Sequence, residues 1–162
     1  MKTHNKILLA GELLVDAEKT YRSGETDGEF AKSILLAGAV IGIVAPLLEE
    51  QKIKSSHVQL AEMAARLRGL DVTNLPPKKR GREIGRSIGF YRLVYNSLKH
   101  AGDREKVKPS QDLLFDANLK EEAGHLISSA IDDYNKLSLL RRETNLELSD
   151  NLLTLLQSGW VA

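Results

Sequence analysis

The residues best suited to chemistry lie near the end of a basic segment, where Asn96 and His100 are four positions apart. On a helix this spacing puts both side chains on the same face. An imidazole changes its protonation near neutral pH, so it can act as a general acid or base. Arg92, one turn before Asn96, and Lys99 add positive charge that can hold a phosphate. We therefore treat His100, Asn96 and Arg92 as candidate catalytic residues.

The same residues also have a purely structural interpretation. A histidine in the last turn of a helix is favoured because its cationic form complements the helix dipole. An asparagine near a helix end often bonds only to backbone. Tyr91 and Tyr95, also four apart, could stack on a nucleobase or pack within the protein. Both interpretations stay open at this stage.

The charge of the chain is unevenly distributed, although its net value is only +1. Residues 1–77 carry a net charge of −1 and residues 109–162 a net charge of −5. Residues 78–108 contain ten basic and three acidic residues, a net charge of +7. Such a segment can bind a polyanion, or it can be a solvated face neutralised by an acidic partner. The candidate RNA-binding residues are Lys78, Lys79, Arg80, Arg82, Arg86 and Lys99.

The segment 95–102 resembles the signature of the HEPN superfamily of helical bundles. Its usual form is an arginine, a polar residue that is often asparagine, a few variable residues and a histidine. Asn96 and His100 match the polar residue and the histidine. Tyr95 stands in place of the arginine, and Arg92 is the nearest arginine before it. The chain is also similar to uncharacterised bacterial helical domains with an Asn-x-x-Lys-His segment.

The resemblance implies an RNA-binding protein, with possible metal-independent ribonuclease activity in a bacterial toxin or defence system. Active relatives pair two motifs across a homodimer, so that the histidine and arginine act on the ribose 2′-hydroxyl and the scissile phosphate. By that analogy His100 would be the acid or base, Asn96 would orient it and Arg92 would stabilise the transition state. No metal or other cofactor is implied. Relatives that have lost the motif act as binding modules, so the alternative is a non-enzymatic helical protein-interaction or regulatory module.

The elements that must position these residues are helices, which predict an all-α fold. Apolar residues recur at three- and four-residue steps, and we find neither strand alternation nor an internal repeat. We expect one domain over 1–162, an antiparallel bundle of five to six helices with its core over 4–140. The expected helices span 4–22, 29–50, 56–68, 78–101, 119–140 and, as a C-terminal docking helix, 149–157.

The helix over 29–50 is apolar on nearly every side, which predicts that it is the central, buried element. Its apolar run over 33–48 is sixteen residues long, and a membrane span needs roughly 20. We therefore expect a core helix and no membrane association. The chain has no cysteine, so a thiolate metal site is excluded and a cytoplasmic location is expected.

Several local features predict details of the fold. Ser56 and Gln59, and likewise Asn118 and Glu121, have the spacing of a capping box. Three glycines four residues apart predict a close approach of another helix or a ligand to the fourth helix, or a small-ligand site beneath them; they are Gly81, Gly85 and Gly89. We expect His57 to be exposed, His125 to be a surface or packing residue, and Trp160 either to be exposed or to contact a partner.

Overall fold

The computed structural model describes residues 1–100, 108–137, 147–158 and 160. Within these ranges the regular structure is helical, and no strand is present. The fold is therefore all-α, as predicted. In chain order the helices are α1 (Lys6–Ser23), α2 (Asp27–Glu50), α3 (Ser56–Leu67), the 3-10 turn η1 (Val72–Asn74), α4 (Pro77–Tyr91), α5 (Leu93–Lys99), the 3-10 turn η2 (Pro109–Gln111), α6 (Leu119–Lys136) and α8 (Asp150–Gln157).

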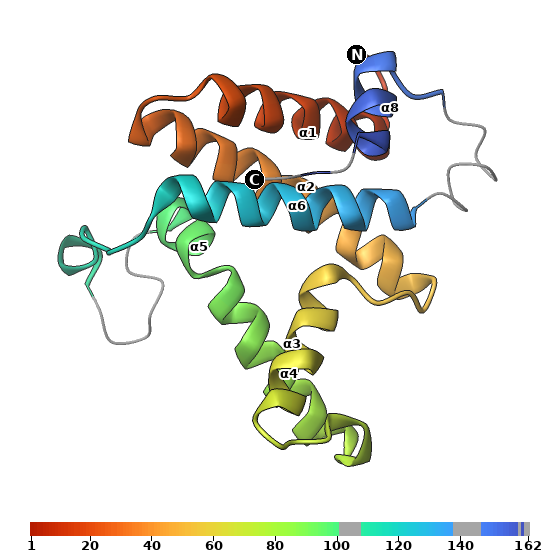
Figure 1. The fold of residues 1–162 in the computed structure, drawn as a ribbon, viewed down its shortest axis with the longest axis vertical. Helices are drawn as coiled ribbons and strands as arrows, with labels where there is room; N and C mark the ends of the chain where they lie inside the picture. The colour runs from red at the N-terminus through yellow and green to blue at the C-terminus, as the bar shows by residue number, and fades with distance from the viewer. Residues whose placement is uncertain (101–107, 138–146, 159, 161–162) are drawn as a thin grey trace.

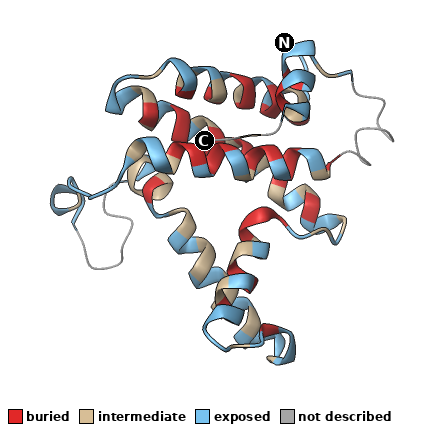
Figure 2. Cartoon of the chain, viewed as in Figure 1, coloured by how far each residue is buried: buried red, intermediate tan, exposed pale blue. Residues whose placement is uncertain are grey.

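Helix α2 is the centre of the core and lies between α1 and α6 (Figure 1). Its inward residues, such as Ile34, Val40 and Leu48, are fully buried. Two buried hydrogen bonds join the helices: the Ser33 hydroxyl donates to the Ala17 carbonyl at 2.7 Å, and the Tyr134 hydroxyl to the Ile7 carbonyl at 2.8 Å. The buried residues concentrate in these helices (Figure 2).

By length and composition alone, α2 is the one helix of the described chain that could cross a membrane. A core helix of a soluble protein can satisfy the same two criteria. Here α2 packs against α1, α5 and α6. These contacts bury 44% of its most apolar stretch.

Most helices begin at residues whose side chains satisfy free backbone donors. Asn5, Asn118 and Ser149 cap α1, α6 and α8, respectively. Helix α2 starts with a capping box in which Thr26 and Glu29 bond reciprocally. These starts depend on neighbouring residues only, so sequence patterns can indicate them.

The capping box predicted at Ser56 and Gln59 is wrong. Ser56 is the first residue inside α3, and the preceding Ser55 makes no side-chain capping hydrogen bond in the described structure. Instead, the Ser56 backbone N–H donates to Asp133 Oδ1 of α6 at 2.6 Å. The cap comes from a residue 77 positions away, which no local pattern can show.

Helices α3 and α4, with η1 between them, project away from the bundle (Figure 1); we call residues 56–91 the arm. In the described structure no residue of α4 is buried. The close approach of a helix predicted at Gly81, Gly85 and Gly89 is wrong, because a Cβ on any of them would meet no described atom within 4 Å. The ligand alternative stays a prediction, since Gly81 and Gly85 line a cavity of about 550 Å³ beside α2. The glycines border open space, since the arm leaves the bundle too early for another helix to cover them.

The helix predicted over 78–101 is broken at Arg92, where the backbone turns (φ −106°, ψ 10°). Helix α5 then continues only to Lys99, and His100 is extended (φ −135°, ψ 139°). The break changes the chain direction and lets α5 pack against α2. The predicted cap at Gly102 lies outside the described residues, as does the end of the helix predicted to reach residue 140.

Trp160 is not a free docking residue. Its indole N–H donates to the Gly124 carbonyl at 3.2 Å, and its ring lies 5.3 Å from that of Tyr21. The Arg22 guanidinium lies 4.6 Å from the ring centroid. Trp160 therefore packs on the end of α1 and on α6.

Tyr95, the residue in the arginine position of the motif, packs face-on against Gly38 of α2. A Cβ at position 38 would overlap the Tyr95 ring, whereas one at Gly42 would meet no described atom within 4 Å. Glycine at position 38 thus allows α5 to approach α2. Tyr95 packs within the protein, which is the structural alternative left open above.

We predict that Gly38→Ala lowers the free energy of unfolding by about 1–3 kcal/mol, because the added methyl group forces the Tyr95 ring away. The matched control is Gly42→Ala, on the same helix. It should raise that free energy by up to about 1 kcal/mol through better helix propensity. Urea denaturation monitored by circular dichroism measures both changes. Equal effects of the two substitutions would contradict the packing described.

Candidate functional site

The three candidate catalytic residues follow one another along α5. The Asn96 N–H donates to the Arg92 carbonyl at 2.8 Å, and the His100 N–H donates to the Asn96 carbonyl at 3.0 Å. Asn96 is half-buried and His100 is exposed. The described structure shows no side-chain hydrogen bond or ion pair for His100. Within one chain the three side chains therefore do not form a hydrogen-bonded site.

Arg92 is engaged elsewhere, since its Nε donates to Nδ1 of His57 at 3.2 Å. His57 is only 3% exposed, so the predicted exposure of this residue is wrong. Its ring stacks on Tyr91, with centroids 6.1 Å apart and planes 22° apart. His57 is covered by Tyr91 and Arg92, at the turn between α4 and α5.

The environment of His57 favours the neutral imidazole. Burial, followed by the positive charge of Arg92, lowers the pKa of His57 to about 4. Since Nδ1 accepts the hydrogen bond from Arg92, the ring hydrogen of the neutral form is on Nε2. His57 is thus a fixed hydrogen-bond donor at neutral pH.

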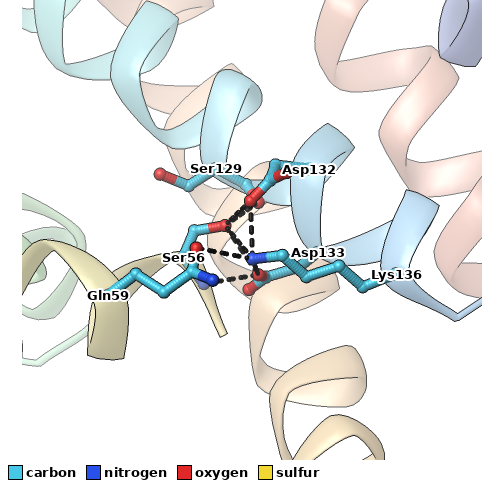
Figure 3. Close-up of polar contacts among 6 residues, drawn as sticks. All are labelled: Ser56, Gln59, Ser129, Asp132, Asp133 and Lys136. Carbon is cyan, nitrogen blue, oxygen red and sulfur yellow. Dashed lines mark hydrogen bonds and ion pairs between the residues drawn. The ribbon is translucent and has the colours of Figure 1, made fainter. Parts of the chain in front are cut away.

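A second polar cluster joins α3 to α6 (Figure 3). The Ser56 hydroxyl lies within hydrogen-bonding distance of Asp133 Oδ1, at 2.6 Å, and of Asp132 Oδ2, at 2.5 Å. The Lys136 ammonium donates to Asp132 Oδ2 at 2.6 Å and to Gln59 Oε1 at 3.0 Å. These residues tie the arm to the bundle.

The chemistry of this cluster favours a structural role. The Lys136 ammonium forms ion pairs with Asp132 and Asp133, at 2.6 and 3.5 Å, and so offsets the negative charge beside Ser56. Burial raises the pKa of Asp133, against the hydrogen bonds from Ser56. Among the described residues, Asp133 Oδ2 is the one buried side-chain nitrogen or oxygen atom without a hydrogen-bond partner.

No sequence pattern described above predicted this cluster, although the position of Asp133 indicates a buried carboxylate. Asp133 lies three residues after Ala130 and seven after Leu126, on the apolar face of α6. A carboxylate on a buried face needs a partner. The sequence could have indicated this need, but it could not show that the partner is the start of α3.

The candidate RNA-binding residues of α4 differ in how far they are already paired. Arg80 bonds Glu62 at 3.0 Å, and Arg86 lies 3.6 Å from Glu83. Lys78, Lys79 and Arg82 are exposed and form no ion pair with any described residue. Lys99, on α5, lies 5.7 Å from the ring centroid of Tyr95. The basic charge of α4 that is free of ion pairs is therefore at the start of that helix.

Of the two alternatives for His125, the structure shows the surface position: its side chain is exposed, with Nε2 3.8 Å from a Glu121 carboxylate oxygen. In the described part of the chain, no three histidine, aspartate or glutamate side chains come together as a metal site. Comparisons of the chain with protein-family models, curated proteins and solved structures find no match. The function proposed below is therefore based on the geometry of the chain itself.

We predict that folding depends on the neutral state of His57. Because the pKa of His57 is lower in the folded chain, its contribution to stability is complete above pH 6.5 and is lost as pH falls from 6.5 to about 4. The loss is on the order of 3 kcal/mol. Urea denaturation from pH 7 to 4 should show a shallower decline for His57→Gln than for the unsubstituted protein. A His57 imidazole that titrates near pH 6.5 by NMR would contradict this expectation.

Proposed function

We propose that the protein binds RNA, with the basic face of α4 contacting the phosphate backbone. The observation that carries the proposal is the exposed, unpaired group Lys78, Lys79 and Arg82 on a projecting helix. Helix α4 contains five basic residues and one acidic residue, Glu83. Exposed lysines and arginines bind a polyanion by releasing its counterions, without any need for base contacts.

Aromatic side chains at the far end of the same helix favour single-stranded RNA over a duplex. Phe90 is 73% exposed, although it is a large apolar residue, and Tyr91 is half-buried beside it. Proteins that bind single strands combine a positively charged surface with aromatic rings on which bases stack. The arm offers both features on one helix.

A metal-independent ribonuclease activity is the further part of this proposal, based on the resemblance to the HEPN signature. The exposed position of His100 supports it, because the imidazole is open to a substrate. Arg92 is bound to His57 within one chain. An active arrangement would therefore bring together His100 of two copies in a homodimer. We propose a role in a bacterial toxin or defence system, with RNA in the cytoplasm as its target.

A protein-interaction module is the alternative, and a separate observation favours it. Three large apolar side chains of the arm are uncovered: Met63 (54% exposed), Leu67 (82%) and Phe90 (73%). An exposed apolar surface of this kind can be covered by a partner protein. The two functions differ in their salt dependence, since binding to RNA weakens steeply with salt.

We predict that the triple substitution of Lys78, Lys79 and Arg82 by alanine weakens binding to a labelled uridine 12-mer. The slope of log Kd against log salt concentration should fall by about 0.7 for each phosphate contact removed. Fluorescence anisotropy over a range of salt concentrations measures both quantities.

The matched control replaces three exposed lysines near the N-terminus by alanine, namely Lys2, Lys6 and Lys19. It removes the same charge and should leave the salt slope unchanged. If both triple variants weaken binding equally, the RNA surface is not α4. If the unsubstituted protein binds no RNA, the interaction module replaces the proposal.

We predict that His100→Ala reduces RNA cleavage by at least about 10²-fold, because it removes the general acid or base. A chelator should not change the rate at which the unsubstituted protein cleaves RNA. Unfolding free energy and oligomeric state should not change, since His100 is exposed and outside the core. A full cleavage rate in the variant, or no cleavage by the unsubstituted protein, would remove the nuclease part and leave RNA binding to be judged separately.

A further inference from the structure

A cavity of about 690 Å³ lies between the arm and α6. This volume is within the range of roughly 300–1,000 Å³ that is typical of small-molecule sites. Its walls bring together aromatic, carboxylate and imidazole groups from different parts of the chain. Those that bear on its chemistry are His57, Phe90, Tyr91, Asp116 and Glu122.

One wall of the cavity is aromatic. The rings of Phe90 and Tyr91 are 6.0 Å apart at 72°, and the Tyr91 hydroxyl donates to the Leu60 carbonyl at 3.4 Å. Tyr91 is also stacked on His57, so its ring is held on two sides. A rigid aromatic surface of this kind is suited to stacking against a planar ligand.

The polar groups of the cavity have a definite donor and acceptor pattern. His57 is buried, and Arg92 occupies its Nδ1, so Nε2–H is the donor that remains. Nε2 has no hydrogen-bond partner among the described residues. The carboxylates of Asp116 and Glu122 likewise form no hydrogen bond or ion pair with any described residue. The cavity therefore offers the Nε2–H donor and two free carboxylate acceptors, beside the hydroxyls of Ser128 and Ser129, and its lining contains no lysine or arginine.

We infer that this cavity binds an unstacked guanine base of the RNA, an inference that rests on the proposed RNA-binding function. The Watson–Crick edge of guanine presents one acceptor, O6, and two donors, N1–H and N2–H. A carboxylate accepts both donors, and the His57 Nε2–H can donate to O6. Adenine and cytosine each present one amino donor, at the position of guanine O6, and uracil presents one donor, N3–H, so none of them offers two adjacent donors to a carboxylate. Recognition of single-stranded bases by stacking and by their Watson–Crick edges is general among RNA-binding proteins.

The surroundings of the cavity separate the base from its phosphate. Phe90 and Tyr91 also line a neighbouring hollow of about 440 Å³, whose lining contains Arg68 and Arg86. The carboxylates repel a phosphate from the cavity itself, while the two arginines attract it to the neighbouring hollow. A nucleotide can thus place its base beside α6 and its backbone along α4.

The test compares four uridine 12-mers that carry a single central guanine, inosine, adenine or cytosine. The guanine oligomer should bind about 5- to 150-fold more tightly than the adenine or cytosine oligomer, the discrimination expected of one bidentate pair. Inosine lacks the N2 amino group and should fall between them. Glu122→Gln should remove the preference for guanine and for inosine and leave binding to the adenine and cytosine oligomers unchanged.

The matched control is Glu121→Gln, which changes the adjacent residue of α6. Glu121 is 65% exposed, pairs with His125 and does not line the cavity, so guanine preference should persist. Equal affinity for the four oligomers, or a preference that survives Glu122→Gln, would overturn the guanine site and leave the proposed RNA binding intact. Failure to bind any of the oligomers would instead overturn the proposed function.

Discussion

The buried carboxylate of Asp133 is the constraint on which the arrangement of the arm depends. The first N–H groups of a helix need acceptors, and α3 has no side-chain cap of its own among the described residues. Asp133 supplies that acceptor from α6 and also contacts the Ser56 hydroxyl. Burial makes a charged carboxylate unfavourable, which is why the pKa of Asp133 is raised despite these hydrogen bonds. The contact holds the beginning of the arm against the bundle, and it thereby sets the direction in which the arm, including α4, projects.

The second end of the arm is held by α5. Tyr95 lies against Gly38, so α5 packs closely on α2, and Arg92 reaches His57 at the turn between α4 and α5. The two attachments leave α4 packed on α3 with no buried residue, and they place Phe90 and Tyr91 on a cavity shared with α6. As a result, Phe90 and Tyr91 line both the cavity that contains the carboxylates and the hollow that contains Arg68 and Arg86. The proposed path of a single RNA strand follows from this arrangement.

The position of Tyr95 also bears on the HEPN resemblance. In the motif the corresponding residue is an arginine that acts on the scissile phosphate, whereas here the tyrosine ring is used for packing. Arg92, the nearest arginine, makes its hydrogen bond to a buried histidine. The chain therefore has a stronger physical basis for binding RNA through α4 than for assembling a nuclease site from the residues of one copy.

The sequence by itself determined the helical class, the central position of α2 and most helix starts, because three- and four-residue periodicity and adjacent capping residues are local properties. It also determined that residues 78–108 are basic. Only the tertiary structure decided that His57 is buried, that the stripe from Gly81 to Gly89 is open, and that Trp160 folds back onto α1 and α6. The cap at Ser56 and the cavity beside α6 join residues far apart in the chain. Such contacts depend on how the helices pack, and a local pattern carries no information about which distant group completes them.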